Sequence, residues 1–193
     1  MAKRVFFSFH YKDVADFRAN VVRNHWMTKP DREICGYYDA SIWESARKSG
    51  DVALKRLINA GLDQTSNTCV LIGAHTYERP WVRYELLKSF KTGNAIFGVH
   101  INSIKSKLGT VEAKGPNPLE FVGVTYSESG RTATLWERLN GKWAEYDAIE
   151  GSASFRVDVA QKYRGQGYNL SKFYDTYDWV EDSGFDNFAR WVG

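Results

Sequence analysis

The stretch that decides the fold reads CVLIGAHTYERPWVRYEL and covers residues 69–86. Its first residues are apolar up to Gly73, which is typical of a buried strand. A helix is predicted to follow over about 79–92, because apolar residues recur there four positions apart and form one stripe at about 100° per residue. Glu85 lies roughly 60° from Val82, on the border of that stripe. We therefore expect a half-buried carboxylate near the carboxyl end of a strand, where open α/β sheets bind ligands.

Apolar strands and amphipathic helices alternate through the first half of the chain. Continuous apolar strands separated by helices indicate a parallel sheet with helices on both faces. Right-handed crossovers leave few topologies, and the flavodoxin-like order 2-1-3-4-5 is the expected one for a five-stranded sheet. Strands are expected at about 4–9, 36–39, 68–72 and 95–101, and helices at about 13–26, 51–62 and 79–92. The first helix is predicted to bury Val14, Phe17, Val21 and Val22, Asp51 to cap the second, and 28–36 to form a loop.

The pattern changes in the second half. A loop rich in Gly, Lys, Pro and Ser covers 102–118, and three segments then alternate in the manner of strands. Asn140-Gly141, between the last two of them, is a strong hairpin signal. We interpret the chain, residues 1–193, as one α/β domain with a small antiparallel insertion and a C-terminal helix. Its core is placed at 3–102, the insertion at about 119–147, and the last strand and helix at about 172–193.

Composition excludes several classes of protein. The chain has 193 residues, and 43% apolar and 25% charged residues are ordinary for a globular domain. A net charge of +3 without a basic cluster argues against nucleic acid, and no apolar run approaches the ~20 residues that span a bilayer. Cys35 and Cys69 lack partner histidines, so neither a disulfide nor a metal site is predicted. Met-Ala-Lys-Arg leads directly into a strand, which leaves no room for a signal peptide and favours the cytoplasm.

Aromatic residues make up 15% of the chain and gather in its last third. Such residues usually add a layer to the core and only sometimes form a binding surface. We expect a core role for Trp136, Trp143, Tyr146, Tyr163, Tyr168, Tyr174, Tyr177, Trp179 and Trp191.

Several segments carry a family resemblance. Residues 4–13 read as a first strand and polar loop similar to the opening box of TIR domains. Trp81-Val82-x-x-Glu85 looks like their third conserved block, which carries the glutamate of NAD-cleaving members. Together with 37–44, 114–118 and 177–180, these segments make the chain resemble the TIR-like ThsB proteins of bacterial Thoeris antiphage systems over nearly its full length.

The resemblance implies a TIR fold and an enzyme that cleaves NAD⁺ at the nicotinamide–ribose bond and releases a cyclic ADP-ribose isomer. It further implies that this product diffuses to a ThsA-type effector NADase and that a phage supplies the trigger. A homo-oligomer and a monomer both stay open as the active form. Neither a nucleic acid nor a membrane is expected as a partner. No G-x-G-x-x-G fingerprint follows the first strand, so NAD⁺ is expected as a substrate and no resident cofactor is predicted.

The chemistry of NAD⁺ cleavage indicates which residues to look for. The nicotinamide is already cationic and leaves without a general acid, so the enzyme must stabilise an oxocarbenium-like ribose. Glu85 is the predicted catalytic residue, since a poorly hydrated carboxylate beside Trp81 would act strongly on that charge. An aromatic collar would exclude water during cyclisation. The predicted substrate-binding residues are Phe9, His10, Tyr11, Asp39, Trp43 and Trp81; no metal is predicted.

Plainer interpretations stay open. Glu85 could pair with Lys88 or Ser89 one turn further on, while Asp39 could form a turn and Trp43 could fill the core. The pair His10-Tyr11 stands where TIR enzymes tend to carry basic residues, which leaves recognition of the pyrophosphate open. The alternative function is a non-catalytic TIR-fold adaptor that acts through protein–protein contacts.

Overall fold

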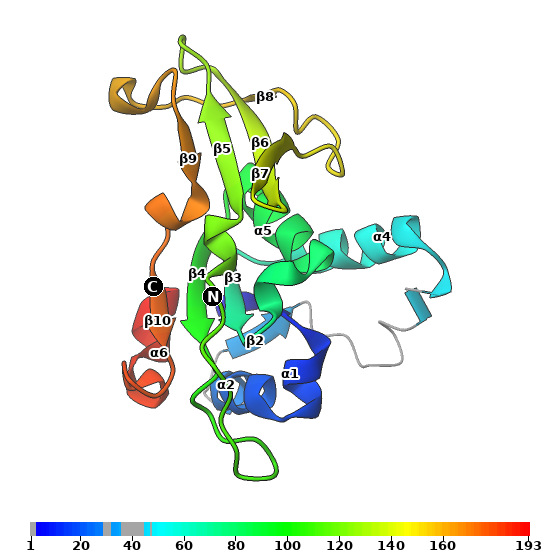
Figure 1. The fold of residues 1–193 in the computed structure, drawn as a ribbon, viewed down its shortest axis with the longest axis vertical. Helices are drawn as coiled ribbons and strands as arrows, with labels where there is room; N and C mark the ends of the chain where they lie inside the picture. The colour runs from blue at the N-terminus through cyan, green and yellow to red at the C-terminus, as the bar shows by residue number, and fades with distance from the viewer. Residues whose placement is uncertain (1–2, 29–31, 36–44, 47) are drawn as a thin grey trace.

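The structure, a computed structural model, describes residues 3–28, 32–35, 45–46 and 48–193 (Figure 1). Its centre is a parallel sheet with the strand order β10-β4-β3-β1-β2. Buried side chains run almost continuously through β3 and β4, as expected for parallel strands covered on both faces. The strands are β1 (Lys3–Phe9), β2 (Arg32–Cys35), β3 (Asn67–Ile72), β4 (Ala95–His100) and β10 (Thr176–Asp178). The predicted parallel sheet flanked by helices is confirmed.

Helices enclose a hydrophobic core on each face of this sheet. Phe6 and Ile72 belong to the core that α4 and α5 cover, whereas Phe7 and Leu71 belong to the core that α2 and α6 cover. Phe6 and Phe7 are both about 1% exposed. Among the described residues no helix is long and apolar enough to cross a membrane. The helices are α1 (Tyr11–Ala15), α2 (Arg18–Met27), α4 (Asp51–Leu62), α5 (Pro80–Thr92) and α6 (Gly184–Val192).

The first helix was predicted as one continuous helix over about 13–26, but the structure has two helices there, and part of the predicted buried face is exposed. It breaks at Phe17, which adopts a left-handed backbone with φ 69° and precedes α2. Phe17 and Val21 are 48% and 42% exposed, while Val22 is buried as predicted. The break turns Arg18 inward in their place, and Arg18 finds polar partners there. Because periodicity assumes a continuous helix, it could not locate this change of face.

The second strand begins at a different residue from that predicted, whereas α4 covers the predicted 51–62 and differs only in its cap. β2 spans Arg32–Cys35, where a loop was expected. Among the described strands, β2 pairs with β1 alone and forms an edge of the sheet. The strand expected at 36–39 lies outside the described residues. Gly50, with φ 95°, takes the cap position predicted for Asp51, which is the first helical residue of α4.

A second, antiparallel sheet follows the long 102–118 loop and forms the upper part of the molecule in Figure 1. The predicted antiparallel strands are confirmed, with Asn140 and Gly141 both at positive φ in their hairpin turn. Val122, Val124 and Leu135 on its inner face join the core beneath α5. Its strands are β5 (Val122–Tyr126), β6 (Thr132–Leu139), β7 (Lys142–Glu145), β8 (Phe155–Arg156) and β9 (Gly167–Asn169), of which the last two were not predicted.

Candidate active site

Glu85 is a buried carboxyl group on α5. Its exposed fraction is 5%, so it is more deeply buried than the stripe analysis suggested. Among the described residues no cation forms an ion pair with it. Burial raises the pKa of Glu85 from 4.5 to about 8, and the hydroxyl of Ser8 on β1 opposes this rise only in part. A carboxyl group in this setting is strongly perturbed and has no structural ion pair to explain it, which is typical of functional positions.

Ser89 does contact Glu85, as one of the plainer interpretations expected, but it bonds to the backbone of Glu85 and not to its side chain. Ser89 donates its hydroxyl proton to the backbone carbonyl of Glu85 at 2.7 Å, and its Oγ lies 2.8 Å from Thr68 Oγ1 on β3. These bonds tie α5 to the sheet through the backbone of Glu85 and do not involve its carboxyl group. The backbone of α5 is therefore held against β3 at Glu85, and the Glu85 side chain takes no part in that anchor.

The alternation of side chains along β1 decides which residues meet Glu85. Phe6 belongs to the core beneath α5, and Ser8, two residues on, lies on the same face. Phe7 and Phe9 belong to the opposite core, where the guanidinium of Arg23 lies 5.7 Å from the Phe9 ring centroid. Phe9 and Glu85 are therefore not brought together. Ser8 was missed by the sequence reading, although the period of two along the strand could have identified it.

His10 directly follows β1 and precedes α1. Burial lowers the pKa of His10, and the nearby charges of Arg79, His75 and Lys12 lower it further. The loop after β1 thus lies beside the turn between β3 and α5, and several cationic groups gather there. Arg79 immediately precedes α5, which places it about 9 Å from Glu85 along the helix axis at 1.5 Å per residue. The basic groups that the opening loop seemed to lack come largely from this second segment.

Of the other predicted site residues, the structure describes Tyr11 and Trp81. Tyr11 is 47% exposed at the start of α1. Trp81 is partly buried and packs edge-to-face on Tyr84, with ring centroids 5.8 Å apart. Asp39 and Trp43 lie outside the described residues.

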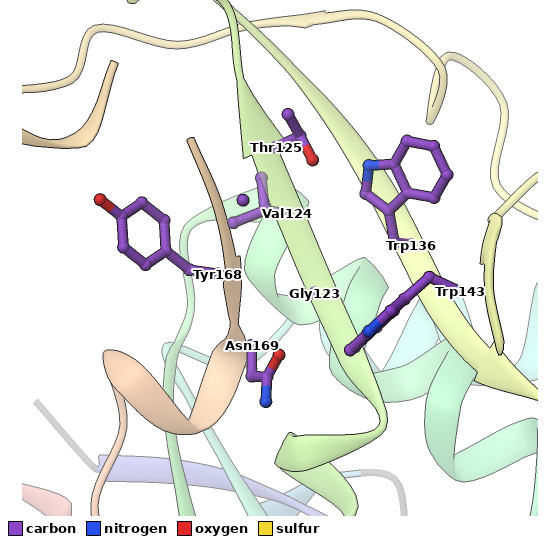
Figure 2. Close-up of a pocket in the computed structure, with 8 residues that line it drawn as sticks. Gly123, Val124, Thr125, Trp136, Trp143, Tyr168 and Asn169 are labelled. Carbon is purple, nitrogen blue, oxygen red and sulfur yellow. The ribbon is translucent and has the colours of Figure 1, made fainter. Parts of the chain in front are cut away.

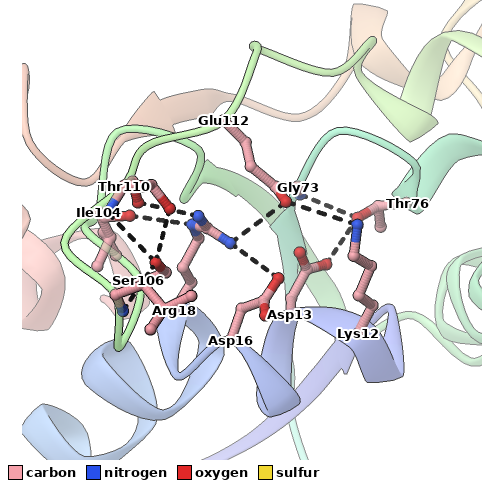
Figure 3. A network of polar contacts seen from close by, with 11 residues as sticks. Lys12, Asp13, Asp16, Arg18, Gly73, Thr76, Ile104, Ser106, Thr110 and Glu112 are labelled. Carbon is pink, nitrogen blue, oxygen red and sulfur yellow. Dashed lines mark hydrogen bonds and ion pairs between the residues drawn. The ribbon is translucent and has the colours of Figure 1, made fainter.

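A polar network holds the loops at the carboxyl edge of the sheet (Figure 3). Thr76 Oγ1 accepts a hydrogen bond from the Gly73 N–H at 2.9 Å and faces Asp13 Oδ2 at 3.4 Å. Asp13 is buried, and its pKa is raised to about 6 by burial and by the neighbouring Glu112 carboxylate. These contacts join the segment after β1 to the turn after β3.

Arg18 is the centre of the same network and is 1% exposed. It donates to the backbone carbonyls of Ile104 and Thr110, both at 3.0 Å, and forms ion pairs with Asp16 at 3.2 Å and Glu112 at 3.4 Å. The long 102–118 loop is thereby fastened to the beginning of α2. The network therefore joins the segment after β1, the turn after β3 and the 102–118 loop at the carboxyl edge of the sheet.

The geometry around Glu85 falls within a stretch that matches a known family. Residues 6–106, from β1 past the end of β4, match the model of the Thoeris protein ThsB, TIR-like domain. The chain belongs to this ThsB family. It is 54% identical to a protein of Bacillus cereus (strain MSX-D12) named "Putative cyclic ADP-D-ribose synthase ThsB1", over 194 residues that cover 100% of both chains.

Two negative observations complete the site of this ThsB chain. Within the part of the chain that the structure describes, no group of three or more His, Cys, Asp or Glu side chains is placed to hold a metal ion. Cys69 is a free, fully buried thiol in β3, and burial raises its pKa well above the usual value. A thiol of that kind is a poor nucleophile, so Glu85 is the strongest candidate for chemistry among the described residues.

Proposed function

We propose that this protein cleaves NAD⁺ at the nicotinamide–ribose bond and joins the ADP-ribose to itself, releasing a cyclic ADP-ribose isomer. Membership of the ThsB family and the name of its 54% identical relative support this activity. The observation that carries the mechanism is the buried carboxyl group of Glu85, which has no cationic partner among the described residues. NAD⁺ is the substrate in this proposal, and no resident cofactor is needed.

Glu85 would act on the charge that forms on the ribose. As the bond to the cationic nicotinamide breaks, positive charge moves onto the ribose, and a carboxylate in a site of low polarity stabilises that charge strongly. With a pKa of about 8, Glu85 is mainly protonated in the free protein at neutral pH. The approach of the cationic nicotinamide ring favours the ionised form, because an opposite charge within a few ångströms lowers the pKa of an acid. Substrate binding would thus generate the catalytic carboxylate.

The neighbouring cations would hold the pyrophosphate. Lys12 and Arg79 bring positive charge to the loop after β1, at the carboxyl edge of the sheet, and His10, whose pKa is lowered, would offer a neutral ring N–H as a hydrogen-bond donor. We assign further substrate contacts to Tyr11 and Trp81, and to Asp39 and Trp43, which lie outside the described residues. Phe9 is not part of this proposal, because it faces the opposite core.

The wider function is proposed to be signalling in antiphage defence. Cyclisation needs a folded substrate and exclusion of water, and the aromatic side chains near the site suit both needs. The product would diffuse to a ThsA-type effector NADase in the cytoplasm after a phage trigger, and assembly of several copies would gate the activity. We further propose that the chain is one decorated domain with a flavodoxin-like sheet, since residues of both sheets share one core.

The test of the catalytic assignment is Glu85→Gln, which removes the charge and keeps the size. Nicotinamide release should fall at least about a hundredfold, the scale on which one electrostatic group acts. Glu120→Gln, at an exposed glutamate in η2 (Pro118–Glu120), is the matched control and should release nicotinamide at the wild-type rate. Wild-type turnover in a folded Glu85→Gln protein would contradict the assignment.

A second experiment, on filtrates from infected cells, distinguishes the enzyme from the adaptor alternative. Protein-free filtrate from infected cells that express this chain should activate a purified ThsA-type NADase, and filtrate from cells with Glu85→Gln should not. The filter retains a 22.1 kDa chain, so an active filtrate must contain a small molecule. Activation only when both proteins share the tube would favour the adaptor.

A further inference from the structure

A groove lies on the outer face of the antiparallel sheet, away from Glu85 and from the loops around His10. Its volume is about 370 Å³. Figure 2 shows its labelled residues on the four strands β5, β6, β7 and β9. We call it the outer groove; the residues that matter here are Gly123, Thr125, Trp136, Trp143, Gly167 and Asn169.

Strand register builds the outer groove. Gly123 of β5 pairs with Trp136 of β6 on one side and with Asn169 of β9 on the other. Thr125, two residues on, pairs with Gly167, so these side chains lie on one face of the sheet. The two glycines carry no side chain, and the ring of Trp143 lies close against Gly123. At Gly123 a Cβ would lie 3.3 Å from the ring of Trp143 and 2.8 Å from the backbone oxygen of Tyr168.

The two tryptophans of the outer groove have no part in either hydrophobic core of the described chain. The inner face of the same sheet supplies Val124 and Leu135 to the core, whereas Trp136 and Trp143 stand on the other face. Trp143 is 42% exposed. The expected core role is wrong for Trp136 and Trp143, although Tyr146 and Trp179 do join the cores. Indole rings that stabilise no core and remain in contact with water are available for binding.

Trp136 also carries an unused hydrogen-bond donor. Its Nε1 is buried and has no hydrogen-bond partner among the described residues. In Figure 2 the nitrogen of this ring is turned toward the side of the groove where Thr125 lies. Buried indole N–H groups usually have a partner, so an acceptor atom that enters here, with a small movement of the ring, would satisfy it.

We propose that the outer groove binds an uncharged aromatic heterocycle of the size of a purine base. The residues that line it carry no charge, so its recognition cannot rest on a phosphate or carboxylate. The volume lies at the small end of the range for ligand pockets and suits one fused ring system. Indole faces stack on flat π-systems, and Trp136, Thr125 and Asn169 supply donors for ring nitrogens. A pyranose would need more polar side chains for its hydroxyl groups than these provide.

The experiment follows the indole N–H resonances of ¹⁵N-labelled protein during titration with adenosine. The signals of Trp136 and Trp143, assigned with Trp136→Phe and Trp143→Phe, should shift and saturate. Ribose and methyl glucoside serve as probes without a heterocycle and should leave both signals in place. An absence of shifts with adenosine, shifts confined to other tryptophans, or a response to methyl glucoside alone would each overturn the proposal.

Variants locate the binding independently of catalysis. Trp143→Ala should weaken adenosine binding about five- to a hundredfold, the range for loss of one base–aromatic stack. Gly167→Ala adds a methyl group 3.2 Å from Thr125 Oγ1 at the floor of the groove and should also weaken binding while both tryptophans remain. Phe185→Ala removes a 64% exposed aromatic ring from α6 and is the matched control, with unchanged affinity. Unchanged affinity in both groove variants would overturn the assignment.

Discussion

Replacing Glu85 with glutamine should stabilise the protein increasingly as the pH rises. In the folded chain burial raises the pKa of Glu85 to about 8, whereas the unfolded chain ionises it near 4.5. Between these values the folded state holds a proton that the unfolded state has lost, so wild-type stability falls with rising pH. The slope is about 1.4 kcal/mol per pH unit for one group. From pH 5 to pH 8 the difference between Glu85→Gln and wild type should therefore grow by up to about 4 kcal/mol.

The assay is urea denaturation of both proteins at pH 5, 6, 7 and 8. Only the difference between the two free energies of unfolding is needed, because titration of Asp13 and of other groups is common to both proteins and cancels. A difference that stays constant from pH 5 to pH 8 would refute the raised pKa, and with it the inference that Glu85 is a protonated, poorly hydrated acid in the free protein.

Three further predictions concern activity and packing. Since Glu85 must ionise, kcat/KM for nicotinamide release should rise about tenfold per pH unit below pH 8 and level off above it, and a flat profile would exclude this role. Arg18→Met should cost about 3–5 kcal/mol in urea denaturation, because Glu112 and two backbone carbonyls lose their buried partner; a loss below 1 kcal/mol would show that the network is dispensable. Gly115→Ala should destabilise by roughly 1–3 kcal/mol, since its Cβ would overlap the backbone oxygen of Gly73; unchanged unfolding would disprove this close approach.

The parallel sheet was predictable because its strands are short, apolar runs between amphipathic helices. β3 and β4 appear within one residue of the predicted bounds at each end, and the Asn140-Gly141 turn was readable from two residues alone. The break at Phe17 was not readable, since a left-handed phenylalanine follows no local sequence rule. What compensates it is the set of contacts that Arg18 makes with Ile104 and Thr110, far along the chain.

The site was predictable only to the level of its elements. The placement of Glu85 on the helix after β3 follows from local pattern, but the pattern predicts a half-buried carboxylate and the structure buries it more deeply. Residue type alone favours Phe9 as a site residue, whereas the alternation of faces along β1 places Ser8 on the side of Glu85 and Phe9 on the opposite side. Arg79 lies near His10 because of the path of the turn between β3 and α5. No single segment of the sequence specifies that path.

The order of the parallel sheet has a consequence for synthesis of the chain on the ribosome. β4 pairs with β10, but about 75 residues, including the whole antiparallel sheet, are translated between them. At a translation rate of ~5–20 residues per second, the edge of β4 that pairs with β10 stays unpaired for on the order of 4 to 15 s. An unpaired strand edge is a template for association with other chains. Chaperone dependence of the nascent protein should therefore fall sharply once the residues of β10 have left the exit tunnel.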